Sequence, residues 1–148
     1  MRKLVTLLSL CSFLFAGSSL KIFISVDMEG IGGIGTSEMT RSTGKDYNIG
    51  RKLMTSEVNA VVTAIYQFNP SAEILVNDSH GDMQNLNHQE LDPRVIYIQG
   101  NKKPYGMVQG LDKSFDGAIF SYKFLKPAKT QLNYWHFVAV LNQLRLLL

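Results

Sequence analysis

The sequence predicts an α/β fold, with a parallel or mostly parallel sheet flanked by helices. Two observations support this prediction. Short runs of apolar and β-branched residues recur along the chain, and a long amphipathic segment separates the first two of them. Strands that alternate with a helix or a long loop are typical of parallel sheets, because a parallel connection must cross back over the sheet. The 148 residues suit one domain with a real core.

The expected elements follow from the spacing of the apolar residues. Lys21–Val26 (KIFISV) predicts a buried strand. From Tyr47 to Phe68 apolar residues recur at three- and four-residue spacing, which predicts an amphipathic helix with Asp46 as its N-cap and an end at Asn69-Pro70. Further strands are expected at residues 73–77, 94–98 and 117–120. Residues 36–46 are expected to form a loop, and the apolar residues 135–148 a helix with almost no polar face.

The first 18 residues have the pattern of a secretory signal peptide. Arg2 and Lys3 precede an apolar run, and small residues at 16–18 suit a signal peptidase. The run is about 13 residues long, whereas about 20 are needed to span a bilayer, so cleavage is favoured over anchoring. We therefore expect an exported, periplasmic or secreted protein without stable membrane association. Cleavage would also remove Cys11, the one cysteine, which excludes a disulfide and a cysteine metal ligand.

The distribution of charge argues against a nucleic-acid partner. The chain has 15 Lys and Arg against 12 Asp and Glu, a formal net charge of +3. Two of the basic residues lie in the expected signal peptide, and every acidic residue lies before residue 121. The body of the chain is therefore mildly acidic, and only its last residues are basic. No stripe of Lys and Arg interleaved with aromatic residues is present in the sequence, so we expect no nucleic-acid partner.

Two carboxylates and an imidazole fall at the expected ends of neighbouring strands. Asp27 and Glu29 lie two residues apart after the first strand, and His80 follows the second strand beside Asp78. The carboxyl ends of parallel strands are where ligands bind. Taken singly, such residues more often form turns or pack, and Asp78 has that alternative reading as a side-chain turn. Together, Asp27, Glu29 and His80 predict a divalent metal site, with zinc the leading candidate.

A dinucleotide site is the rival interpretation of the same loop. Gly30–Gly35 fits the pattern G-x-G-x-x-G and follows a predicted strand. That site needs a helix that opens inside the motif and an acidic residue about 20 positions later. The residues after the motif are expected to form a loop, and Asp27 and Glu29 would repel the phosphates. We expect the glycines to let the backbone turn sharply around a site.

Three separated motifs together resemble one known family. They are Ser25–Ile31 (SVDMEGI), Val76–His80 (VNDSH), and Met107–Asp112 (MVQGLD) before Phe115–Phe120 (FDGAIF). The chain resembles the D-aminopeptidases of the DppA type, a family of dinuclear zinc peptidases. Positions in the predicted helix and Lys103-Pro104 fit the same pattern. The resemblance covers about residues 21–120, in consistent order.

The resemblance implies an activity, a cofactor and an assembly. The implied protein is an α/β aminopeptidase that releases N-terminal D-amino acids from short peptides with two zinc ions per subunit. Asp27 would bridge both ions, with Glu29 and His80 each binding one of them. Such a bridging carboxylate offsets the repulsion between two dications. Family members assemble into rings, so a homo-oligomer is implied.

After Phe120 the chain departs from the family pattern. The family continues with a Gly-Tyr-His motif whose His binds metal, then a catalytic His and a ligating Glu. Here the residues are Ser121-Tyr122-Lys123, and no acidic residue follows Asp116. An ammonium group cannot coordinate zinc. His136 matches no family motif, so the catalytic residues stay unassigned.

Three segments are therefore expected: a signal peptide (1–18), a D-aminopeptidase-like α/β domain (19–120) and a divergent tail (121–148). The tail contains no glycine and no acidic residue. This composition suggests a reading frame broken near Phe120, and a genuinely diverged, shortened member is the alternative. Both predict weak or single-metal binding and little peptidase activity. Two other classes stay open, a non-catalytic exported protein that binds metal or peptide, and a nucleotide-binding α/β domain.

Overall fold

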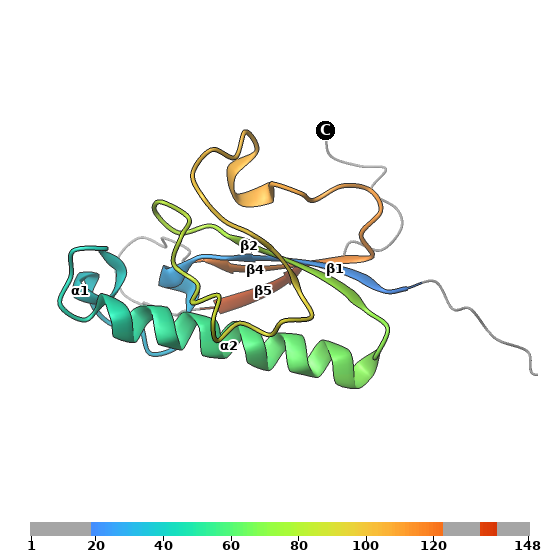
Figure 1. The fold of residues 1–148 in the computed structure, drawn as a ribbon, viewed down its shortest axis with the longest axis horizontal. Helices are drawn as coiled ribbons and strands as arrows, with labels where there is room; N and C mark the ends of the chain where they lie inside the picture. The colour runs from blue at the N-terminus through green and yellow to red at the C-terminus, as the bar shows by residue number, and fades with distance from the viewer. Residues whose placement is uncertain (1–18, 123–133, 139–148) are drawn as a thin grey trace, which may run out of the picture.

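The computed structural model describes residues 19–122 and 134–138. Its centre is a five-stranded sheet with the order β3-β2-β1-β4-β5 (Figure 1). β1 pairs in parallel with β2 and β4, β2 pairs in parallel with β3, and β5 runs antiparallel to β4. The mostly parallel α/β sheet predicted from the sequence is confirmed. The strands are β1 (Lys21–Val26), β2 (Glu73–Asp78), β3 (Ile96–Ile98), β4 (Gly117–Tyr122) and β5 (Tyr134–Val138).

One long helix and three short helical turns complete the described residues. They are η1 (Met28–Gly30), α1 (Ser37–Thr40), α2 (Tyr47–Phe68) and η2 (Gly106–Val108). α2 has the predicted bounds, and Asp46 is its N-cap residue, although the Asp46 side chain makes no capping hydrogen bond. The expectation of a plain loop over residues 36–46 is wrong in part. α1 forms there because the carbonyls of Thr36 and Ser37 accept the amides of Met39 and Arg41.

Two strands differ from the sequence prediction for local reasons. β3 begins at Ile96 rather than at residue 94, because Asp92 and Arg94 close a turn. The Asp92 carboxylate accepts both the amide and the guanidinium of Arg94. The predicted helix over residues 135–148 is wrong for its first part, since residues 134–138 form β5. Aromatic and β-branched residues favour a strand in that segment. The rest of that prediction lies outside the described residues.

α2 covers one face of the sheet (Figure 1). The side chains that meet there come from alternate positions of β1 and β2 and from every third or fourth position of α2. Each buried aliphatic side chain of this size stabilises the fold by about 1.5–3 kcal/mol. The principal members are Ile22, Ile24, Val26, Met54, Val58, Val62, Ile74 and Val76.

The opposite face of the sheet is covered by the chain between β3 and β4, which includes η2 (Figure 1). Phe23 of β1 packs edge-on against Phe115, with ring centroids 5.9 Å apart. The side-chain amide of Asn77 donates to the carbonyl oxygens of Gly106 and Met107 at 3.0 and 2.9 Å, which links η2 to β2. β1 is thus buried on both faces, as its continuous apolar run predicts.

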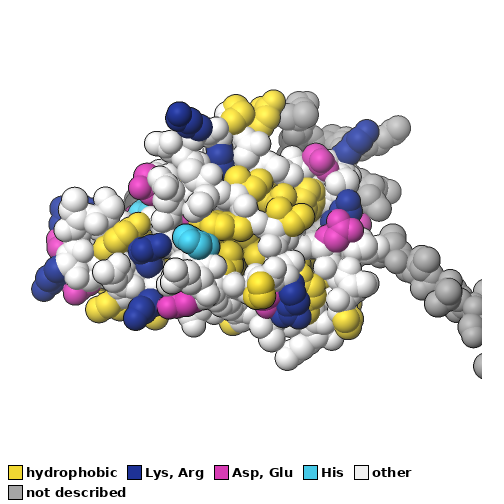
Figure 2. Space-filling view, in the orientation of Figure 1, with side chains coloured by type: hydrophobic (Ala, Val, Ile, Leu, Met, Phe, Trp, Pro, Cys, Tyr) yellow, Lys and Arg dark blue, Asp and Glu magenta, His cyan; other side chains and the backbone are white. Residues whose placement is uncertain are grey.

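The surface of the described residues is mixed in charge. On the face in Figure 2, basic and acidic side chains are interspersed around a central group of hydrophobic side chains. No helix in the described part of the chain combines the length and apolarity needed to cross a membrane. The expectations about export and about nucleic acid stay predictions.

Candidate metal centre

The centre lies where β1, the middle strand, ends between its two parallel neighbours. Val26 is paired with Asp78 on one side and with Ser121 on the other. Backbone pairing continues one residue further, because the Asp27 amide donates to the Ser121 carbonyl and the Ser79 amide donates to the Val26 carbonyl, both at 2.8 Å. The order of the strands reverses at β1, which is where open parallel sheets place ligands.

A 3-10 turn, rather than a continued strand, places Glu29 beside Asp27. The amides of Gly30 and Ile31 donate to the carbonyls of Asp27 and Met28, which closes η1 directly after β1. Met28 is fully buried and holds the turn against the core. Glu29 remains at the surface of the turn, with its side chain 35% exposed. The two carboxylates therefore lie close together because of this turn, and not because the strand continues.

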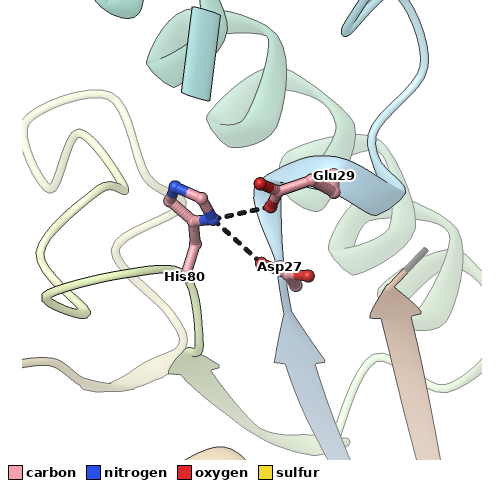
Figure 3. Close-up of side chains that lie close together, drawn as sticks. All are labelled: Asp27, Glu29 and His80. Carbon is pink, nitrogen blue, oxygen red and sulfur yellow. Dashed lines mark hydrogen bonds and ion pairs between the residues drawn. The ribbon is translucent and has the colours of Figure 1, made fainter. Parts of the chain in front are cut away.

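The structure brings the three predicted residues together (Figure 3). His80 Nδ1 lies 2.7 Å from Glu29 Oε2 and 3.0 Å from Asp27 Oδ1. One ligand atom from each of the three residues lies within 4.8 Å of the others, and all three side chains are partly buried. Their role as metal ligands stays a prediction. The three ligand atoms are close enough together for one small cation to contact them all.

Mutual contacts shift the pKa values of the three groups. Burial, reinforced by the Glu29 charge, raises the pKa of Asp27 above its ordinary value. The hydrogen bond from His80 lowers the pKa of Glu29 to about 2. Burial acts to lower the pKa of His80, but hydrogen bonds to Asp27, Glu29 and the Thr40 carbonyl outweigh it and raise that pKa to about 10. In the metal-free protein an imidazolium thus supplies the positive charge that two adjacent carboxylates require.

Asp78 is not directed at this trio but holds the loop that carries His80. It is fully buried, and its carboxylate accepts the amides of Asn85 and Leu86 at 2.6 and 2.8 Å. The Asn85 side chain and the Tyr97 hydroxyl donate to the same carboxylate. The alternative reading of Asp78 as a turn-forming residue describes this arrangement. Its hydrogen bonds fold residues 79–86 back over the end of β2.

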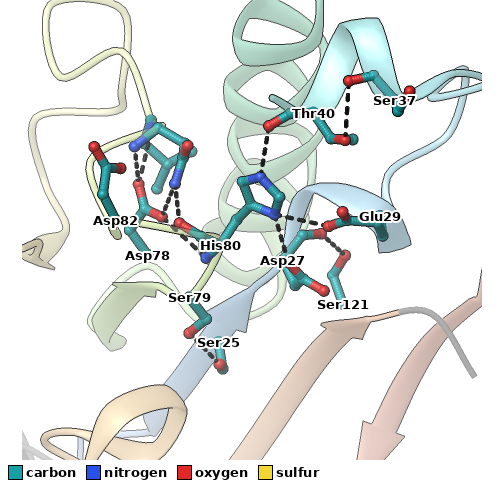
Figure 4. A network of polar contacts seen from close by, with 12 residues as sticks. Ser25, Asp27, Glu29, Ser37, Thr40, Asp78, Ser79, His80, Asp82 and Ser121 are labelled. Carbon is teal, nitrogen blue, oxygen red and sulfur yellow. Dashed lines mark hydrogen bonds and ion pairs between the residues drawn. The ribbon is translucent and has the colours of Figure 1, made fainter. Parts of the chain in front are cut away.

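Sequence reasoning missed three groups that support the site. Thr40 contacts His80 through its backbone carbonyl, at 2.8 Å from Nε2 (Figure 4). Asn85 ties Asp78 to the His80 carbonyl. The Lys103 ammonium donates to the Asn77 side chain and to the Asp78 carbonyl. A contact made by a backbone carbonyl cannot be predicted from the residue type. Lys103 was noted as part of the family resemblance, but the sequence did not indicate that it lies beside the site.

A pocket of about 430 Å³ opens beside the trio, and Glu29 and His80 line it. Hydroxyl groups, a guanidinium and carboxylates form its wall, so its chemistry suits a small polar ligand of mixed charge better than an apolar one. Arg41 on this wall also pairs with Glu38. The other lining residues are Thr40, Arg41, Ser42, Thr43, Gly81, Asp82 and Asn85.

The residues present fit a divalent zinc-type ion. Two carboxylate oxygens and an imidazole nitrogen are ligands that zinc accepts, and the near contact of two carboxylates favours a cation between them. Zinc usually takes four ligands, and the described residues of this cluster supply three. A bound ion of this kind would polarise a carbonyl group and lower the pKa of a coordinated water.

The glycine-rich loop has a different role from the one that a dinucleotide motif requires. α1 begins at Ser37, after the last glycine of the pattern, and has only four residues. The Gly32 amide donates to the Glu57 carboxylate of α2 at 2.8 Å, so this amide already has an acidic partner inside the protein. Gly33 has a φ of 82°, which allows the turn. The loop joins η1 to α1.

Comparison with known proteins places this chain in a family. The model of the D-aminopeptidase family (Peptidase_M55) matches residues 20–122. A D-aminopeptidase of Bacillus subtilis (strain 168) is 42% identical over 101 residues, which are 68% of this chain and 36% of that protein. The solved structure of the Bacillus subtilis protein DppA, described as a zinc-dependent D-aminopeptidase and self-compartmentalizing protease, has a TM-score of 0.70 and 39% identity. The match covers 74% of this chain and 40% of that structure.

The chain therefore spans well under half the length of these relatives. Within the matched part, the family model covers most of the described residues, including the strand ends that carry Asp27, Glu29 and His80. Sequence, fold and family model agree over the same segment, and the chain belongs to the D-aminopeptidase family of hydrolases.

Proposed function

We propose that Asp27, Glu29 and His80 bind zinc and form one part of a D-aminopeptidase centre. The observation that carries the proposal is the position of His80 Nδ1, which faces both carboxylates at 2.7 and 3.0 Å at the carboxyl ends of parallel strands. The family match supports zinc as the ion, since the similar solved structure is described as zinc-dependent. Mixed charge in the adjoining pocket is compatible with a peptide amine and carboxylate.

The proposed substrate is a short peptide with an N-terminal D-amino acid. The support is the D-aminopeptidase description of the matching family and of the Bacillus subtilis relative. A homo-oligomer is proposed because the similar structure is described as self-compartmentalizing. Export is proposed from the pattern of residues 1–18 alone.

We further propose that this chain binds one zinc ion more readily than two, with little peptidase activity. Three protein ligands serve one ion, and a second ion would need donors beyond this cluster. The segment after Tyr122, where the family resemblance predicts further ligands, carries Lys123 in place of a histidine. A non-catalytic metal-binding or peptide-binding role is the alternative within the same proposal.

The test is metal analysis of the purified full chain after zinc loading and removal of unbound ions. We expect about one zinc per chain, and no stoichiometric zinc in His80→Ala. His88→Ala is the matched control, because His88 is exposed and lies outside the cluster. Equal zinc content in wild type and His80→Ala would refute the proposed site. Two zinc ions per wild-type chain would refute the proposed stoichiometry.

Turnover is measured separately on D-alanyl and L-alanyl peptides with added zinc. Slow release of D-alanine that disappears in Asp27→Ala would support the enzyme proposal. Zinc and peptide binding without turnover would favour the non-catalytic alternative. Robust turnover lost in Asp27→Ala would show that the expected loss of activity is wrong.

A further inference from the structure

His80 makes one contact that metal binding does not itself require. Its Nε2 lies 2.8 Å from the carbonyl oxygen of Thr40 (Figure 4). A carbonyl oxygen can only accept, so Nε2 carries the proton in this contact. The other nitrogen, Nδ1, is the atom that faces Asp27 and Glu29. The ring orientation therefore leaves Nε2 to donate to the Thr40 carbonyl and Nδ1 to face the two carboxylates.

The carbonyl that fixes the ring belongs to a very short element. Thr40 is the last residue of α1, and the carbonyls of a final helical turn have no partner within the helix. Such a group is free to accept a hydrogen bond from a side chain elsewhere. A helix of four residues has no independent stability, however. The position of the Thr40 carbonyl must therefore be set by what α1 packs against.

Two glycines let other backbone segments approach α1 closely. A methyl group at Gly50, in the first turn of α2, would lie 2.3 Å from the Met39 carbonyl oxygen and 3.2 Å from the Met39 carbonyl carbon. A methyl group at Gly44 would lie 2.1 Å from the Glu38 carbonyl oxygen. Real Cβ atoms do not approach backbone so closely, so a side chain at either position must change the distance between α1 and the segment that carries the glycine. Gly50 touches the residue directly before Thr40.

We propose that α1 is the positioning element for the metal-binding imidazole, and that Gly50 sets its place. Gly50 fixes the backbone at Met39 and Thr40, the Thr40 carbonyl holds the Nε2 proton of His80, and Nδ1 is thereby presented to the ion. The inference rests on the proposed zinc site. Partners of this kind, on the outer nitrogen of a metal-binding histidine, typically change metal affinity by about 10–100-fold when lost.

The close contact changes what Gly50→Ala is expected to do. In open space the substitution would stabilise the helix by about 1 kcal/mol, because alanine is favoured over glycine inside a helix. The contact at Gly50 is with backbone, which has no rotamer with which to give way. Gly35 offers the matched control, because a methyl group there would meet nothing within 4 Å. Gly35 lies in the loop before α1, whereas Gly50 lies in α2, and Gly35 makes no comparable close approach.

The experiment compares wild type, Gly50→Ala and Gly35→Ala as full chains labelled with ¹⁵N-histidine. Zinc affinity is measured by competition with a chelator, and the His80 signals are assigned by their absence in His80→Ala. We expect about 10–100-fold weaker zinc binding in Gly50→Ala and little change in Gly35→Ala. With ¹¹³Cd²⁺ as the probe, the wild type should show metal–nitrogen coupling to Nδ1 and a protonated Nε2.

Cadmium coupling to Nε2 would overturn the proposal, as would equal zinc affinities in Gly50→Ala and Gly35→Ala. If Gly50→Ala does not fold, Gly44→Ala makes the same comparison, because it displaces α1 through Glu38. If the wild type binds neither metal, the proposed function fails. The contact between Thr40 and His80 is then tested in the metal-free protein by the exchange rate of the Nε2 proton. Slow exchange of the Nε2 proton, lost in Gly50→Ala but kept in Gly35→Ala, would then support it, and equal exchange rates would overturn it.

Discussion

At the residue scale, Asp78 shows how a buried carboxylate orders the loop that carries a proposed ligand, His80. It accepts three backbone amides, one side-chain amide and one phenol, all from residues after β2. These donors are buried or partly buried, so each would lose a partner without gaining water if the carboxylate were removed. Asp78 is adjacent in sequence to the site and acts on it through the loop conformation.

Asp78→Ala is therefore expected to lower the free energy of unfolding by about 3–5 kcal/mol, because several buried donors lose their acceptor. Urea denaturation followed by circular dichroism measures the change. Asp82→Ala is the control, since Asp82 is exposed and its carboxylate accepts only the nearby Gln84 amide among the bonds described. A loss no larger than that of Asp82→Ala would show that the loop does not depend on Asp78.

At the element scale, α2 supplies most of the packing on one face of the sheet. Met54, Val58 and Val62 are fully buried against β1 and β2, while the opposite side of the helix carries exposed polar residues. The same helix also contributes Gly50 to the position of α1 and Glu57 to the Gly32 amide. Core packing and site geometry are thus properties of one element.

Met54→Ala is expected to lower the free energy of unfolding by about 2–5 kcal/mol, because it leaves a cavity in a fully buried position. Lys52→Ala, two residues away on the exposed side, should change it by less than about 0.5 kcal/mol. Thermal or urea denaturation of both variants checks the contrast. Similar small losses in both would show that α2 does not pack as described.

At the scale of the whole molecule, zinc and folding should be linked. An ion that binds only the folded chain stabilises it by about 2.7 kcal/mol at a concentration 100 times its dissociation constant. We expect zinc to raise the melting temperature of the wild type and of His88→Ala, and to leave His80→Ala unchanged. Calorimetry with and without a chelator measures this shift. The same rise in His80→Ala would place the ion elsewhere on the protein.

The sequence predicted those parts of the molecule that depend on local pattern. The apolar run of β1, the helical spacing of α2, and the carboxylate and imidazole side chains at the strand ends can be recognised from neighbouring residues. The Thr40 carbonyl, the Asn85 bonds and the short α1 could not be read in this way. The Thr40 contact joins residues 40 positions apart, and this contact, α1 and two of the Asn85 bonds involve backbone groups, which have no side-chain signature.

The pairing of β1 with β2 also has a kinetic consequence. Asp27 and His80 are separated by 53 positions along the chain and meet only once those strands have paired. An ion present at the start of refolding would find no assembled site to nucleate the chain around. We predict that the site is completed after the rate-limiting step of folding, so that zinc leaves the refolding rate nearly unchanged and slows unfolding, as stopped-flow kinetics with and without zinc would measure.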